Sequence, residues 1–150
     1  YNLDLQFIQG DLTQADTNEA FKQAGPYDII LFIGFSCWMP KPALIQHLKL
    51  IQRCLLAPGG VLITDCFSPR RYMISGHHFG YQMNCYEAQM FTNILSYCGF
   101  SLQNIDVQEE AEGIINIFQV QMPFDHPVTL SKGAISQGLY NRYLSKQSKG

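Results

Sequence analysis

The sequence predicts an α/β domain with a mostly parallel sheet and an antiparallel hairpin at its C-terminal end. Two apolar runs of strand length, Tyr27–Gly34 and Val61–Phe67, flank a stretch with helical spacing at Pro42–Leu56. Two further strand-like runs follow a second helical stretch and enclose a short polar turn. A strand, a helix and a strand in succession form a βαβ unit, whose strands run parallel and whose crossover is right-handed.

The first elements are short. Leu3–Gln9 alternates apolar and polar residues and predicts a strand. Thr13–Ala24 carries alanines and one phenylalanine among polar residues, which predicts an amphipathic helix that ends at Gly25-Pro26. Tyr27–Gly34 is apolar without interruption, a pattern typical of a strand buried on both faces of a parallel sheet.

Pro42–Leu56 should be the crossover helix of the βαβ unit. Its apolar residues share one helical face: Leu44, Ile45, Leu48, Ile51 and Leu55. Pro42 fits the first turn of a helix, where its missing N–H costs no hydrogen bond. The sequence Ala57-Pro58-Gly59-Gly60 predicts the stop, because proline cannot continue a helix and glycine permits a reversal. Val61–Phe67 then predicts the second buried strand.

An irregular stretch rich in aromatic residues, Ser68–Tyr86, separates this unit from the closing elements. Loops of this length in compact domains are usually functional or mobile. Glu87–Cys98 predicts a helix that ends at Gly99. The runs Phe100–Glu109 and Ile114–Met122 predict an antiparallel hairpin around a turn at residues 110–113.

The chain should therefore form one domain over residues 1–123 and a polar extension over residues 124–150. Lysine and arginine outnumber acidic residues in the extension, which makes it polar. We expect one helix in it, at Ala134–Leu144. We find no internal repeat or low-complexity tract.

Composition narrows the classes of function. With 47% hydrophobic and 15% charged residues in 150, the chain is not a disordered tail. A net charge of −2 and a pI near 6.0 provide no overall basic field, so we expect no nucleic-acid partner. No apolar run approaches the roughly 20 residues that span a bilayer, so we expect no membrane span. Because the first residue is Tyr1, we expect a piece of a larger protein.

The cysteines favour a reducing compartment. The five residues have apolar neighbours, form no CxxC pair and are odd in number: Cys37, Cys54, Cys66, Cys85 and Cys98. Free cysteine is among the most buried residue types, so we interpret them as small core residues of a cytoplasmic protein.

Three segments in order resemble class I S-adenosylmethionine-dependent methyltransferases. They are Phe7–Leu12 (FIQGDL), Tyr27-Asp28 through Met39-Pro40, and Leu55–Ile63 (LLAPGGVLI). In that family the third segment joins a helix to the fifth strand. The resemblance covers roughly residues 3 to 67, and the later helix and hairpin match the closing elements of the family. It implies a partial Rossmann-like sheet with S-adenosylmethionine as cofactor.

The resemblance also implies a set of cofactor-binding residues. Asp11 would accept a hydrogen bond from the adenine amine, with Leu12 against the ring. The carbonyls of Ile33 and Gly34 would face the methionine portion, while Phe35 would pack near the cofactor. Independently of the family, ligands of open α/β sheets bind beyond the carboxyl ends of the strands, where these residues arrive. Alternatively, Asp11 caps a loop and Gly34 makes a plain tight turn.

Candidate substrate contacts come from the two loops that follow the buried strands: Trp38, Tyr72, His77, His78 and Tyr81. We expect no metal, because adjacent residues of an extended chain point to opposite faces and no zinc spacing is present. By loop position alone, the candidates for a general base are His77, His78 and Tyr81. Asp28 opens its strand at the far end, and Asp65 lies within a strand, so both are interpreted as structural.

The glycine-rich turn and the ribose-binding acidic residue of the family have no counterpart in these 150 residues. We therefore expect the isolated chain to bind S-adenosylmethionine weakly or not at all, because cofactor affinity is spread over those contacts. In the family strand order 3-2-1-4-5-7-6, the strand at Tyr27–Gly34 would also lack a neighbour. We expect its edge to pair with a missing N-terminal part of the same domain or with a second copy.

The function predicted from the sequence is methyl transfer to a small-molecule acceptor, as part of a larger protein. A noncatalytic α/β module for assembly or regulation, derived from a methyltransferase, is the alternative. A short-chain dehydrogenase is a second alternative, but the Tyr-x-x-x-Lys pair of that class is absent from the sequence.

Overall fold

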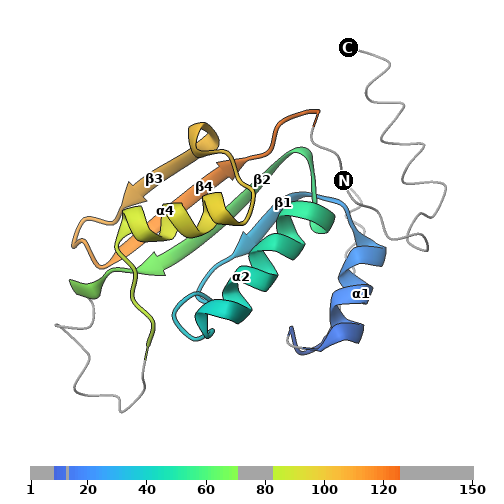
Figure 1. Ribbon diagram of the computed structural model, residues 1–150, viewed down its shortest axis with the longest axis horizontal. Coiled ribbons are helices and arrows are strands. Elements are labelled where there is room, and N and C mark those ends of the chain that lie inside the picture. Colours follow the sequence, from blue (N-terminus) through green and yellow to red (C-terminus); the bar gives the residue numbers. More distant parts are fainter. Residues whose placement is uncertain (1–8, 13, 71–82, 126–150) are drawn as a thin grey trace, which may run out of the picture.

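A computed structural model of the chain describes residues 9–12, 14–70 and 83–125. Within them, four strands form one sheet in the order β1-β2-β4-β3. Figure 1 shows helices α2 and α4 on one face of this sheet, with α1 beyond the β1 side. The described fold is a mixed α/β sheet of partial Rossmann-like type, as the sequence predicts.

The βαβ unit is confirmed. Strand β1 (Tyr27–Phe32) pairs in parallel with β2 (Leu56–Phe67), and Ile30 lies opposite Leu62. Between them run α2 (Lys41–Leu50), with proline in its first turn, and a π-helical turn, η1 (Ile51–Leu55). β2 begins five residues earlier than Val61, so the Pro-Gly-Gly segment forms an irregular first part of the strand.

The flanking helices are also confirmed. α1 (Ala15–Ala24) ends where Gly25-Pro26 was predicted to end it. α4 (Ala88–Tyr97) ends before Gly99, whose φ of +104° is a backbone conformation that favours glycine. Two predicted elements lie outside the described residues: the strand at Leu3–Gln9, of which only Gln9 is described, and the helix at Ala134–Leu144.

The predicted hairpin closes the sheet. β3 (Ile105–Glu109) pairs antiparallel with β4 (Ile115–Gln121), and β4 pairs antiparallel with β2. The first hairpin strand is shorter than predicted, because a 3₁₀ turn, η2 (Leu102–Asn104), precedes it. Of the three strand pairs in the described part of the chain, one is therefore parallel and two are antiparallel.

The core lies between the helices and one face of the sheet. Phe91 of α4 and Phe118 of β4 are fully buried, with ring centroids 4.8 Å apart. Leu44 and Leu48 of α2 and Leu62 of β2 belong to the same buried cluster. Burial of this apolar surface is the main favourable term in folding.

The prediction that β1 is buried on both faces is wrong. Ile29 and Leu31 are each 64% exposed, whereas Phe32, which points to the helix side, is 5% exposed. All the described helices that pack on the sheet lie on one face, so the opposite face of β1 has no cover among the described residues. A continuous apolar run indicates a strand but does not show which of its faces are covered.

No helix in the described ranges is both long and apolar enough to cross a membrane.

Candidate functional site

A sharp turn at Gly34 follows β1 and is held by hydrogen bonds with Asp65 and Cys37. Gly34 has φ +80°, in the left-handed region, and an added Cβ would meet no atom within 4 Å. Its N–H donates to Oδ1 of Asp65 in β2 at 2.8 Å, and its carbonyl accepts from the Cys37 thiol at 3.3 Å. The turn therefore needs glycine for its backbone conformation, and it leaves open space beside the strand end.

Asp65 is a buried carboxyl with a defined partner. It is 6% exposed, and burial raises its pKa above the ordinary value, while the N–H of Gly34 acts in the opposite direction. A carboxylate in an apolar strand needs such a partner, because burying an unpaired charge is costly. Asp65 thus secures the turn at Gly34 across the two parallel strands.

The loop that follows the turn is held in place by hydrogen bonds from Asn84. Its side-chain amide donates to the carbonyl of Met39 at 2.6 Å, and its backbone N–H donates to the carbonyl of Cys37 at 2.8 Å. Trp38 lies on this loop with 57% of its surface exposed. The loop therefore presents a large aromatic side chain on an anchored backbone.

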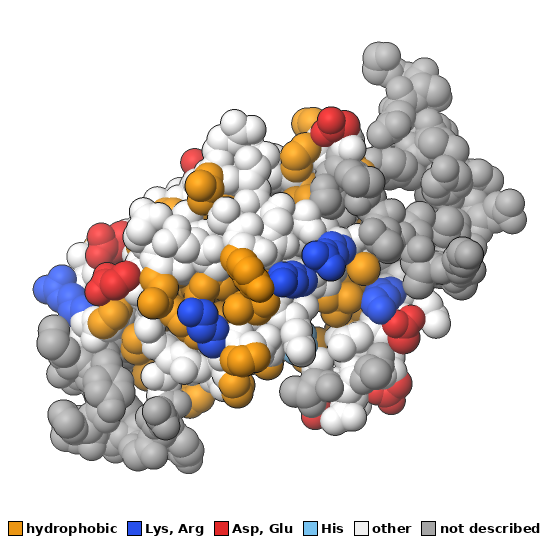
Figure 2. Space-filling model, viewed as in Figure 1, with side chains coloured by type: hydrophobic (Ala, Val, Ile, Leu, Met, Phe, Trp, Pro, Cys, Tyr) orange, Lys and Arg blue, Asp and Glu red, His pale blue; other side chains and the backbone are white. Residues whose placement is uncertain are grey.

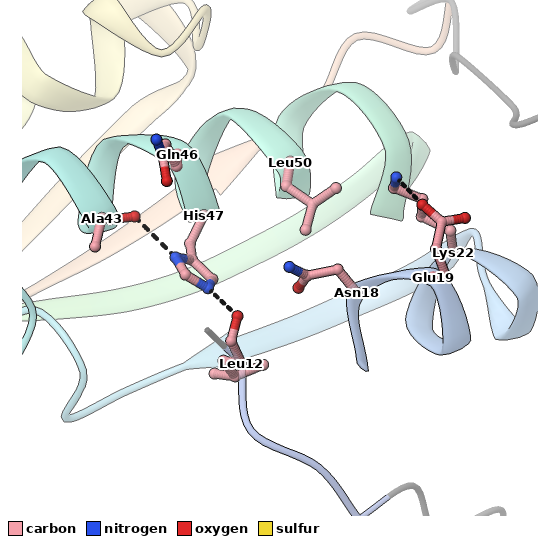
Figure 3. A pocket seen from close by; sticks show the side chains of 8 residues that line it. All are labelled: Leu12, Asn18, Glu19, Lys22, Ala43, Gln46, His47 and Leu50. Atoms are coloured by element: carbon pink, nitrogen blue, oxygen red, sulfur yellow. Dashed lines mark hydrogen bonds and ion pairs between the residues drawn. The ribbon is translucent and has the colours of Figure 1, made fainter. Parts of the chain in front are cut away.

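A cavity of about 380 Å³ runs along the edge of β1, between α1 and α2. Leu12 and Phe35, both predicted to contact the cofactor, line this one cavity together with Phe32 and His47. A second cavity of about 330 Å³ shares Leu12 and His47 with the first and is drawn in Figure 3. The structure thus brings together the loop after residue 9 and the end of β1, which are far apart in the sequence.

The other predicted site residues are distributed around this region. Asp11 is exposed on the loop that leads into α1, and its backbone carbonyl accepts from the N–H of Gln14 at 2.9 Å. Ile33 is also exposed, at the end of β1. The remaining predicted substrate residues lie outside the described residues: Tyr72, His77, His78 and Tyr81.

His47 and Asn84 are not among the site residues predicted from the sequence, and Asp65 was predicted to have only a structural role. His47 sits on the apolar face of α2, three residues after Leu44, and a polar residue at that position should have suggested a buried partner. Asp65 within an apolar strand carried the same signal. Nothing in the sequence around Asn84 indicates its contacts, because they depend on how the chain returns to the loop.

All five cysteines lie within the described residues, and none of them forms a disulfide. Burial raises the pKa of the Cys66 thiol to about 12 and that of Cys98 to about 11, so both stay protonated at neutral pH and are poor nucleophiles. Across residues 9–12, 14–70 and 83–125, no three His, Cys, Asp or Glu side chains are grouped so as to hold a metal. Lysine and arginine side chains are spread along the face seen in Figure 2 and do not gather in one patch.

No protein-family model matches the sequence, and no curated protein does so. Solved structures do resemble the fold. Human N-acetylserotonin methyltransferase in complex with S-adenosylmethionine superposes with a TM-score of 0.55 at 14% identity, over 78% of this chain and 33% of that chain. Magnesium protoporphyrin IX methyltransferase from Synechocystis PCC 6803, with bound S-adenosylhomocysteine, gives 0.52 at 16% identity, over 77% and 50%. A possible exported protein from Bordetella parapertussis gives 0.55 at 13% identity, over 65% and 39%.

At these identities the likeness shows the fold alone. The fold that the chain shares with these structures is a partial Rossmann-like α/β sheet. The chain spans between 31% and 39% of the length of the first three structures that it resembles. Activity, substrate and partners of the whole protein are therefore matters for proposal.

Proposed function

We propose that this chain is the C-terminal portion of a class I methyltransferase domain, which transfers a methyl group from S-adenosylmethionine to a small-molecule acceptor within a larger protein. The observation that carries the proposal is the shared cavity lined by Leu12 and Phe35, beside a glycine turn at the end of a parallel strand. Ligands of open α/β sheets bind beyond the carboxyl ends of the strands, where Gly34 and Phe35 follow β1. Fold neighbours with bound S-adenosylmethionine and S-adenosylhomocysteine support the choice of cofactor.

The residues present fit an adenosyl group. Leu12 and Phe35 supply apolar surface for the adenine ring, and the Asp11 carboxylate is an acceptor for its amine. The open space beside Gly34 allows the backbone of Ile33 and Gly34 to approach the methionine portion without a side chain between them. These five residues are the proposed cofactor contacts of the chain.

These five residues would hold the cofactor, which would supply an electrophilic sulfonium methyl group to an acceptor atom. The protein residues contribute position and exclusion of water. Asp65 and Asn84 hold the turn and loop through hydrogen bonds to backbone atoms, so the strand end keeps its shape when ligands bind. Trp38 is the described candidate for contact with the acceptor, and Tyr72, His77, His78 and Tyr81 remain predicted contacts.

The proposal assigns the glycine-rich turn and the ribose-binding acid to a part of the domain outside these 150 residues. The chain covers half or less of the length of each of these methyltransferase neighbours, which supports this assignment. The 150-residue chain alone should therefore show no binding of S-adenosylmethionine at micromolar concentration by isothermal titration. Micromolar affinity would contradict the proposed division of the site.

Cross-linking tests the function directly. Labelled S-adenosylmethionine should photo-cross-link to the full-length protein, and Asp11→Ala should reduce the yield because an adenine contact is lost. Asp28→Ala is the matched control, since Asp28 is an exposed aspartate near the opposite end of β1. Equal labelling of both variants, or none of the wild-type protein, would refute the proposal.

The alternative, a noncatalytic module for assembly or regulation, is favoured by one observation. β1 is an edge strand in the described sheet and exposes Ile29 and Leu31 on its uncovered face. Apolar sheet edges promote pairing with another polypeptide. We propose that this edge contacts the remainder of the same domain, with a homodimer through the edge as the competing arrangement. A full-length protein that assembles but never cross-links to the cofactor would favour the noncatalytic module.

A further inference from the structure

His47 of α2 joins the helix to the loop that carries Asp11 and Leu12. Its side chain is buried, with Nε2 2.7 Å from the Leu12 carbonyl oxygen and Nδ1 2.8 Å from that of Ala43, one helical turn earlier. Figure 3 shows the ring between these two oxygens. A carbonyl oxygen only accepts, so the bond to Leu12 needs a proton on Nε2. This bond spans 35 residues of sequence.

The imidazole is also packed against the end of β1. Its ring lies 6.4 Å from the Phe32 ring, with 14° between their planes. Phe32 in turn stacks on Phe35, with centroids 4.8 Å apart and planes 13° apart. Such offset stacking is favourable at these separations. A continuous row of contacts thus runs from Phe35 through Phe32 and His47 to the Leu12 carbonyl.

This row connects the two segments that would enclose the adenine ring. Leu12 and Phe35 come from separate parts of the chain, and their relative position depends on whatever links them. The Nε2 bond fixes the backbone at Leu12, while the ring stack fixes the strand end. A side chain without a donor at the Nε2 position would preserve the helix and lose the link to the loop.

We propose that His47 is a positioning residue, which holds the Asp11–Leu12 loop at the distance from Phe35 that adenine binding requires. The proposal rests on the proposed function. His47 contacts no reacting group; it acts through the backbone of Leu12 and through Phe32. Preorganisation of this kind strengthens binding because less ordering remains to be done when the ligand arrives.

Paired substitutions in the full-length protein separate the bond from the packing. His47→Gln places an amide donor near the position of Nε2, whereas His47→Asn places one near Nδ1. Lys49→Ala, on the same helix at a residue that lines neither cavity, controls for damage to α2. Loss of one hydrogen bond changes an equilibrium by roughly two- to tenfold.

Hydrogen exchange without ligand is the first readout. The Gln14 amide, which donates to the Asp11 carbonyl at 2.9 Å, reports closure of the loop. Its exchange should accelerate roughly two- to tenfold in His47→Asn and remain within about twofold of wild type in His47→Gln and Lys49→Ala. Equal exchange in the Asn and Gln variants would overturn the proposal, because the position of the donor would then not matter.

Affinity for S-adenosylmethionine is the second readout and should follow the same order, with a roughly two- to tenfold loss in His47→Asn alone. Faster exchange with unchanged affinity would also overturn the proposal, because the loop would then lie away from the ligand. A wild-type protein that does not bind S-adenosylmethionine would instead refute the proposed function. The exchange data would still show whether His47 holds the loop, so the two failures are distinguishable.

Discussion

Gly34→Ala tests both the backbone and the ligand space at the end of β1. Gly34 has φ +80°, and an L-residue in the left-handed region costs about 1–2 kcal/mol. An added Cβ would meet no atom within 4 Å, so no steric cost inside the protein adds to this value. We therefore expect the free energy of unfolding to fall by about 1–2 kcal/mol, and Tm to fall by about 2–8 °C.

The same Cβ would enter the space proposed for the cofactor. Overpacking of a filled site costs about 1–3 kcal/mol, so affinity for S-adenosylmethionine should fall by roughly five- to a hundredfold in the full-length protein. Gly113→Ala is the matched control. Gly113 has φ +69° in the β3–β4 turn, and an added Cβ there would approach the ends of the Glu109 and Arg70 side chains at 2.9 and 3.0 Å.

Denaturant unfolding followed by circular dichroism and isothermal titration with S-adenosylmethionine measure the two effects. Both variants should lose stability, and only Gly34→Ala should lose affinity. An unfolding free energy unchanged by Gly34→Ala would refute the left-handed backbone. Equal losses of affinity in the two variants would show that backbone strain, and not occupied space, weakens binding.

Three further predictions concern the carboxyl, the core and the uncovered face. Because burial raises the pKa of Asp65, its carboxyl stabilises the fold below the ordinary pKa of 3.8, and this contribution is lost as the pH rises through the raised value. The free energy of unfolding of Asp65→Asn should therefore rise relative to that of the wild type as the pH increases from 3.8 through the raised pKa, as measured by urea unfolding. A difference between the two proteins that does not change with pH would contradict the effect of burial on the pKa. Phe118→Ala should cost about 3–5 kcal/mol, since Phe118 is fully buried against Phe91; a loss below about 1 kcal/mol would mean that the core repacks. Leu31→Lys should leave the stability of a monomer within about 0.5 kcal/mol, because Leu31 is largely exposed, but should reduce any self-association detected by light scattering. Unchanged oligomers would exclude the β1 face as their interface.

Local patterns in the sequence determined which segments form helices and strands. The helical spacing at Leu44, Leu48 and Ile51 and the glycine at residue 99 indicate where helices run and end, and α2, η1 and α4 lie there. The βαβ order of elements also determined that β1 and β2 pair in parallel. Such features depend on neighbours within a few residues, so a single sequence is enough to predict them.

Only the tertiary structure decided the contacts of the candidate site and the cover of the sheet. The bonds from Gly34 to Asp65 and from His47 to Leu12 span 31 and 35 residues, and they depend on strand register and helix orientation. Which face of β1 is exposed depends on where other layers pack against the sheet. The sequence pattern around Ile29 and Leu31 would be the same if these side chains were covered. Side-chain chemistry is local, but the partner of a side chain is set by how distant segments pack together.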